Sequence, residues 1–398
     1  MTDKNTTPKK TSPAKKLLIA SALLIAVALA QHLIFDLIGV EAGQDLRMVD
    51  TDISISYGFD MSASFYSPGN RHFFFAARDG VQKLSSTGEL RWQHGFNLSQ
   101  PNMVGSGEMV AIGEPGGHKI YVFGPAGYLY SVDNLPYPAL YFTVNSTGYL
   151  SVIMRSSTGY IIRAYDPRDH DTFHFHQAIN NPNVFPFSVD VSNCGTYIAK
   201  ALLDVDTLLL SRITFSYKRR VDSRGAQDGF FRSYRFDNEL VARVRFTDDG
   251  RLIAVTDQQI VGFMAGEGNV GTLWNIPLHN RPDKLIIGDN HLAFVTGEAF
   301  LNDPDAEAPG ILHIYNFNGN LTGTYDLGRR ATHLSMSHNT VLAGTDRTFY
   351  AINQHGTLLW EYQAIQDVRD MIFLENTDTI LLAGGNTATI MRRLRAGN

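Results

Sequence analysis

The chain has 398 residues, of which 44% are hydrophobic and 18% charged, and this composition excludes a disordered chain, a collagen and a coiled coil. Such a length suits one large β-architecture or two domains. Its single cysteine, Cys194, cannot form an intramolecular disulfide, a four-cysteine zinc site or a haem-attachment pair. Residues 1–16 carry a charge of +4, and subtracting it from the net charge of −5 leaves −9 on the remainder. So acidic a body disfavours nucleic acid as a partner.

The first forty residues carry the pattern of a membrane anchor. Five lysines, at positions 4, 9, 10, 15 and 16, precede an apolar stretch that runs from Leu17 to Val40. At about 1.5 Å of rise per residue, a helix over 17–35 reaches ~28 Å, close to the hydrocarbon thickness of a bilayer. Because positive residues stay on the cytoplasmic side, we predict a basic cytoplasmic tail at 1–16, a single transmembrane helix at 17–40 and an extracytoplasmic domain after it.

A cleaved secretory signal is the alternative interpretation of this segment. Ala28, Leu29 and Ala30 have the small-x-small form that a signal peptidase accepts after an apolar run. The apolar stretch nevertheless continues to Ile38, beyond the roughly 7–15 residues of a typical signal core. We therefore favour an uncleaved helix that holds the chain in the lipid bilayer of the cell membrane. Both alternatives place the large domain outside the cytoplasm.

From residue 48 onward the sequence predicts an all-β domain over 48–398. Short runs of β-branched and aromatic residues alternate with Gly, Asn, Asp and Pro, and no long stretch has a helical period. Two segments share the pattern Gly-x-Leu-x-Trp, beginning at Gly88 and at Gly356. The same pattern recurs more loosely at three further glycines: Gly127, Gly271 and Gly319. These glycines indicate an internal repeat.

The spacing of the repeat predicts an eight-bladed β-propeller, with seven blades as the alternative. If the interval from Gly127 to Gly271 contains three repeats, the average repeat is about 45 residues, the length of a four-stranded blade. Strand-like runs at 139–177 and 184–217 supply the two units missing from that interval. The last unit has only three strands, and we predict that the strand from Thr51 to Phe59 completes it and closes the ring. Each blade should also have a turn glycine with positive φ and an aromatic or apolar residue packed on the next blade.

Several stretches resemble known repeats. The GELRW and GTLLW segments, at 88–92 and 356–360, resemble the repeats of pyrroloquinoline-quinone-type and WD40-like propellers. Together with the lysine-flanked anchor, the stretches 100–132 and 144–154 resemble an uncharacterised bacterial family of single-pass membrane proteins that carry an extracytoplasmic propeller. This resemblance implies a fold and a location but no activity. The chain is also similar to the outer-membrane assembly propeller, which has eight blades and no cofactor but is a lipoprotein. Because the sequence has three Trp and no vicinal cysteine pair or haem motif, we expect no quinone cofactor.

Two groups of side chains have metal-ligand chemistry. Imidazole is the commonest transition-metal ligand, and even spacing predicts that three histidines share one face of a strand: His170, His174 and His176. Carboxylate oxygens can gather calcium, and three acids alternate in a long loop: Asp303, Asp305 and Glu307. We interpret the histidines as a solvated polar face of an outer strand and the acids as a surface loop. The sequence therefore assigns no metal, cofactor or catalytic residue.

One segment of the domain is strongly basic. Nine basic residues occur from Arg212 to Arg245, and the stretch 216–231 is typical of an elongated hairpin between the outer strands of the fourth blade. Arg and aromatic residues are favoured at protein interfaces, which suggests a partner-binding hairpin. Contact with anionic lipid headgroups or wall polymers and an ordinary solvated loop are the alternatives.

The function that follows is binding rather than catalysis. No Gly-x-Ser-x-Gly elbow, phosphate loop or Cys-x-x-Cys pair occurs in the sequence. We predict a membrane-anchored extracytoplasmic module that binds or scaffolds an unidentified protein or cell-envelope partner. The alternative is an extracytoplasmic hydrolase or oxidoreductase whose site, built from several blades at the channel, escapes motif reading. A sensor is disfavoured, because the 16-residue tail holds no signalling domain.

Overall fold

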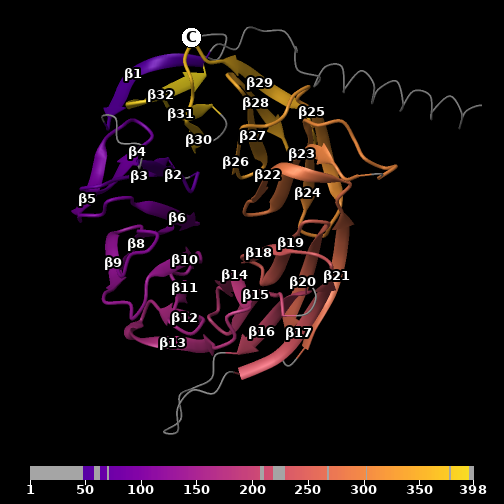
Figure 1. Cartoon of the computed structure of the whole chain (residues 1–398). Coiled ribbons are helices and arrows are strands. Elements are labelled where there is room, and N and C mark those ends of the chain that lie inside the picture. Colours follow the sequence, from indigo (N-terminus) through magenta and orange to yellow (C-terminus); the bar gives the residue numbers. More distant parts are fainter. Residues whose placement is uncertain are drawn as a thin grey trace, which may run out of the picture. The chain divides into compact units, whose positions relative to one another are not determined.

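A computed structural model describes residues 48–57, 63–69, 71–206, 210–217, 229–266, 269–301, 303–375 and 378–393. Within these ranges the chain forms 32 strands in eight four-stranded antiparallel sheets. The sheets, here called blades one to eight, follow one another around a ring, each with one strand at the centre and one at the rim (Figure 1). The predicted eight-bladed β-propeller is confirmed, and the seven-bladed alternative is wrong.

The strands of each blade are given from the centre of the ring to the rim. Blade one comprises β2 (Ser64–Tyr66), β3 (His72–Ala77), β4 (Gly80–Ser85) and β5 (Leu90–Gly95), and blade two comprises β6 (Asn102–Ser106), β7 (Met109–Gly113), β8 (Ile120–Gly124) and β9 (Gly127–Val132). Blade three comprises β10 (Ala139–Val144), β11 (Leu150–Arg155), β12 (Tyr160–Asp166) and β13 (Asp169–Ile179), and blade four comprises β14 (Val184–Val191), β15 (Tyr197–Asp204), β16 (Leu210–Tyr217) and β17 (Gly229–Asp237). Blade five comprises β18 (Val241–Phe246), β19 (Arg251–Thr256), β20 (Gln259–Gly266) and β21 (Asn269–Pro277), and blade six comprises β22 (Asn280–Ile287), β23 (His291–Ala299), β24 (Ile311–Asn316) and β25 (Leu321–Asp326). Blade seven comprises β26 (His333–Ser337), β27 (Thr340–Thr345), β28 (Thr348–Asn353) and β29 (Leu358–Gln363), and blade eight comprises β30 (Asp370–Glu375), β31 (Thr379–Ala383), β32 (Thr387–Arg393) and β1 (Met48–Ser56).

Position within a blade explains the composition of each strand. A second strand lies between the two neighbouring blades, so both of its faces are covered and it reads as an unbroken apolar or small-residue run. Every residue of β27 and of β31 is buried. Outer strands expose one face to water and alternate accordingly, as β5 does.

The last blade closes the ring as predicted. β1 pairs antiparallel with β32, from Met48 opposite Arg393 to Ser56 opposite Thr387. The Thr51 hydroxyl donates a further hydrogen bond of 2.7 Å to a backbone carbonyl of β32. The first described strand therefore supplies the outer strand of the blade that the last three begin, and Figure 1 shows β1 and β32 side by side.

The core is divided among the junctions between blades. Eight clusters of buried apolar residues occur among the described residues, and each takes its members from two neighbouring blades. The junction of blades one and eight, for example, packs Phe73 and Phe75 against Leu381 and Ile390. Each blade is thus stabilised by its neighbours, as the repeat predicts.

The three tryptophans dock one blade on the next. Trp92 stacks on Phe123 of blade two with ring centroids 5.6 Å apart. The indole N–H of Trp274 donates to the Phe317 carbonyl of blade six at 2.9 Å. Trp360 meets Phe373 of blade eight edge to face at 6.4 Å. The predicted packing of an aromatic residue on the next blade is therefore confirmed at three junctions.

Four of the five predicted turn glycines have positive φ: Gly88, Gly127, Gly319 and Gly356. The prediction for Gly271 is wrong. That glycine lies inside β21 and pairs with Met264, and β20 and β21 are joined at 267–268, outside the described residues. This segment has glycines at 266, 268 and 271, and only the last of them fits the Gly-x-Leu pattern of the repeat.

The predicted tail at 1–16 and transmembrane helix at 17–40 lie outside the described residues. In the part of the chain that is described, no helix has the length and apolar character needed to cross a membrane.

Candidate functional site

Each innermost strand begins at the same end of the ring, here called the top face. Because the strands of a blade are antiparallel, the loops before the first strand and those between the second and third strands all lie on this face. In blades six and seven these loops bring together residues 278–279, 303–310, 327–332 and 345–347. Loops held by a rigid scaffold are where binding residues concentrate, so this face is the first place to look for a site.

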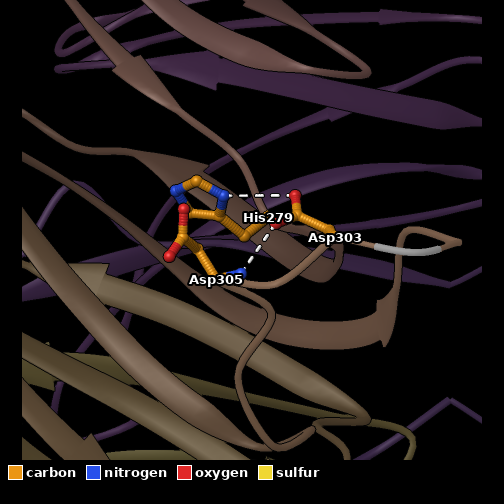
Figure 2. A group of neighbouring side chains, drawn as sticks. All are labelled: His279, Asp303 and Asp305. Atoms are coloured by element: carbon orange, nitrogen blue, oxygen red, sulfur yellow. Dashed lines mark hydrogen bonds and ion pairs between the residues drawn. The ribbon is translucent and has the colours of Figure 1, made fainter.

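A group of potential metal ligands lies on the top face of blade six. His279 precedes β22, and Asp303 and Asp305 belong to the long loop between β23 and β24. One ligand atom from each of these residues lies within 4.8 Å of the others. Figure 2 shows the His279 ring and the Asp303 carboxylate facing each other, with His279 Nδ1 3.2 Å from Asp303 Oδ2. Asp303 Oδ1 also accepts from the Asp305 backbone N–H at 2.9 Å.

The structure does not bring together the three acids that were considered as calcium ligands, and their loop lies at the surface as interpreted from the sequence. Glu307 turns away from Asp303 and Asp305, and its Oε2 lies 2.6 Å from His313 Nε2. Its backbone N–H donates to Asn280, so the loop fixes the direction of this side chain. His279 takes the third place because the loop folds back over the start of β22, a contact between residues 24 positions apart that the sequence pattern does not contain.

A histidine nitrogen with two carboxylates suits a transition-metal ion better than the calcium considered from sequence. The arrangement is also complete without an ion. The hydrogen bond from the Asp305 backbone N–H and, to a smaller extent, the neighbouring His279 ring hold the pKa of Asp303 below its ordinary value. The carboxylate is therefore already stabilised in its charged form.

The three histidines of β13 do not form a site. His174 Nε2 donates to the Gly195 carbonyl at 2.8 Å, and its side chain is only 2% exposed. His170 stacks on Tyr130 with ring centroids 4.8 Å apart, and His176 Nδ1 accepts from Arg163 at 3.3 Å. The predicted solvated face is wrong for His174. Register shifts between β12 and β13 near Tyr165 break the even spacing on which the single face was predicted.

The predicted basic hairpin of blade four is confirmed at its base. β16 and β17 are its two outer strands, and they pair up to Tyr217 opposite Gly229. Four of the nine basic residues fall at 218–228, which lies outside the described residues. On the described stem, Arg212 pairs with Asp204 at 3.4 Å and the Arg232 guanidinium lies 5.5 Å from the Tyr234 ring centroid.

A hollow lies on the top face beside blades seven and eight. It has a volume of about 720 Å³ and a lining dominated by polar and charged side chains. Arg347 pairs with Asp367 at 2.7 Å and Arg329 with Asp346 at 3.6 Å. The exposed fraction of these four side chains ranges from 49% to 89%. Exposed pairs of this kind add little stability, and they leave charged groups accessible to a partner.

A second cavity, of about 370 Å³, lies in the central channel between β6, β10, β14 and β18. Ser188 and Asp190 of β14 satisfy the free backbone edge of β18. The Ser188 hydroxyl accepts from the Val244 N–H at 3.2 Å, and Asp190 Oδ2 accepts from the Phe246 N–H at 2.7 Å. Sequence reasoning missed this cavity, because its walls come from four separate blades.

These features define an eight-bladed β-propeller with a polar top face and a charged channel cavity. The chain belongs to a family of unknown function, DUF5711, whose model matches residues 50–392. No curated protein matches the sequence.

Several solved structures resemble this chain at low sequence identity, and the first of those named here supports the fold alone. BamB from Moraxella catarrhalis is 13% identical with a TM-score of 0.51, and the match covers 87% of this chain and 100% of that one. The β-propeller domain of Cps50 (Swd1) from Myceliophteria thermophila is 11% identical with a TM-score of 0.47, covering 87% and 99%. Apo AztD from Citrobacter koseri is 10% identical with a TM-score of 0.48, covering 77% and 87%.

Proposed function

We propose that this protein is a membrane-anchored extracytoplasmic propeller that binds or scaffolds a protein or cell-envelope partner through its top face. The observation that carries the proposal is the charged hollow beside blades seven and eight. It lies on loops that the ring holds in place, and its exposed Arg and Asp side chains offer several hydrogen bonds to a polar partner. The apolar segment supplies the anchor, and the five lysines before it set its orientation.

The orientation can be tested with the protein's own cysteine. Cys194 is the sole cysteine of the chain and is exposed on the propeller. We expect a membrane-impermeant maleimide to label intact cells or protoplasts at this thiol as fully as it labels lysed cells. Cys194→Ser is the matched control, and it should remove the label in both preparations. Labelling that requires lysis would place the propeller in the cytoplasm and contradict the proposal.

The binding surface can be tested by photo-crosslinking in intact cells. Gln363 lines the hollow and is exposed, so a photo-reactive amino acid in its place should capture the partner as an adduct of defined mass. Tyr128, half exposed on the outer strand β9, is the control position on another surface, and we expect no such adduct there. Failure to capture an adduct from position 363, or the same adduct from both positions, would contradict top-face binding.

The enzyme alternative has less support. Ser188 and Asp190 line the channel cavity and have the chemistry of a nucleophile and a base, and both are bonded to the backbone of β18. Neither is free to activate a substrate in this arrangement, so binding remains the function that the geometry favours.

A further inference from the structure

The channel cavity contains two arginines on one strand. β18 has a register shift between Val241 and Arg243, after which its side chains alternate regularly. Val244 and Phe246 therefore point into the core between blades four and five, whereas Arg243 and Arg245 share the other side of the strand, and all four residues border the cavity. Two neighbouring guanidinium groups are costly at the centre of a ring unless solvent or an anion stabilises their charge, so their place in the channel requires an explanation.

Arg245 is fixed in position by three blades. Its Nη1 donates to the Ile287 carbonyl of β22 in blade six at 3.0 Å. Its Nη2 lies 3.5 Å from the Ser106 hydroxyl of β6 in blade two. The side chain thus reaches from blade five to strands on two other blades, and it presents a positive charge at a set place in the channel.

Arg243 has no such anchor. Within the described residues it has no hydrogen bond and no ion pair, although it is surrounded by the strands of the ring. Its side chain keeps contact with solvent inside the channel. Burial and then the like charge of Arg245 lower its pKa below the ordinary value for arginine. Two like charges therefore line one cavity, and a bound anion would lower the repulsion between them.

The cavity offers these arginines only one carboxylate among its described lining residues, and that carboxylate is already engaged. Asp190 Oδ1 accepts from the Val191 N–H at 2.9 Å, and Oδ2 accepts from the Phe246 N–H at 2.7 Å. Burial raises the pKa of Asp190 to about 6, so the carboxyl is still mostly ionised at neutral pH and offsets only one of the two arginine charges. The cavity is therefore positive within an acidic domain.

We propose that the channel cavity binds a small organic anion whose carboxylate or phosphate group is held by Arg243 and Arg245. Guanidinium groups present their N–H donors in a planar fork that matches both oxyanions. The volume of about 370 Å³ accommodates a ligand of metabolite size and excludes a folded protein. The site is separate from the top-face hollow, so it does not depend on the partner proposed there.

The experiment measures binding to the full chain by isothermal titration calorimetry, with inorganic phosphate and succinate as the two probes. We expect at least one probe to bind saturably in a 1:1 ratio and to raise the melting temperature. Arg243→Gln should weaken that binding at least about tenfold, because it removes the charge and the charge-assisted contact while it keeps a polar, uncharged side chain. The stronger probe identifies the oxyanion as phosphate or carboxylate.

Arg281→Gln is the matched control, because Arg281 is an exposed arginine on the inner strand β22 that does not line the cavity. It should leave the affinity within about twofold. Arg243→Gln should also melt no lower than the unmodified chain, since it removes a like charge from beside Arg245. Equal weakening by both variants, unchanged affinity in Arg243→Gln, or no saturable binding of either probe would overturn the proposal.

Discussion

A fragment that begins at residue 58 should unfold at a much lower urea concentration than one that begins at residue 45, because it lacks β1. The loss removes the outer strand of blade eight together with Ile53, Ile55 and Tyr57, which pack on the cluster between blades one and eight. Burial of these side chains and the hydrogen bonds to β32 together contribute several kcal/mol, on the order of half the stability of an ordinary domain. Equilibrium unfolding followed by tryptophan fluorescence measures the difference.

The shorter fragment should also aggregate, because β32 becomes an unpaired edge. Adding a peptide of residues 45–57 in excess should restore part of the lost stability if the strand acts through pairing alone. Equal unfolding midpoints for the two fragments would show that closure by β1 is dispensable, and that the packing of β30, β31 and β32 on blade one is enough to close the ring.

The sequence was sufficient to predict the architecture because the information that defines a blade is local. A turn glycine, an outer-strand tryptophan and a period of about 45 residues all fall within one repeat. The closing strand was also predictable. The last repeat has three strands, and the strand from Thr51 to Phe59 had no other sheet to join, so a closed ring left one arrangement for it.

The channel cavity was not predictable, since its residues share no local pattern. Asp190 and Phe246 are 56 positions apart, and Arg245 and Ser106 are 139 apart. Only the order of the blades around the ring brings these pairs together. On the sequence, Arg243 and Arg245 were counted with the basic segment of blade four, whereas the structure places them on the first strand of blade five.

The single face predicted for the three histidines is wrong for a related reason. Even spacing predicts a shared face only while the register is regular, and the shifts between β12 and β13 separate His170 from His174. The direction of a loop side chain is set by contacts that residue spacing does not predict. For Glu307 this contact is the hydrogen bond from its backbone N–H to the Asn280 side chain.

Gly356→Ala should cost about 3 kcal/mol or more of unfolding free energy, whereas Gly250→Ala should cost about 1 kcal/mol. Both glycines have nearly equal positive φ, 80° and 84°, and both close a turn by donating to a carbonyl three residues earlier. A Cβ on Gly250 meets no atom within 4 Å, so only the left-handed conformation opposes alanine there. A Cβ on Gly356 would lie 2.3 Å from the Thr324 carbonyl oxygen of blade six, and backbone cannot move aside as a side chain can. Urea unfolding of the two variants measures the difference, and equal costs would mean that the repeat keeps this glycine for its φ alone and not for the close approach of blades six and seven.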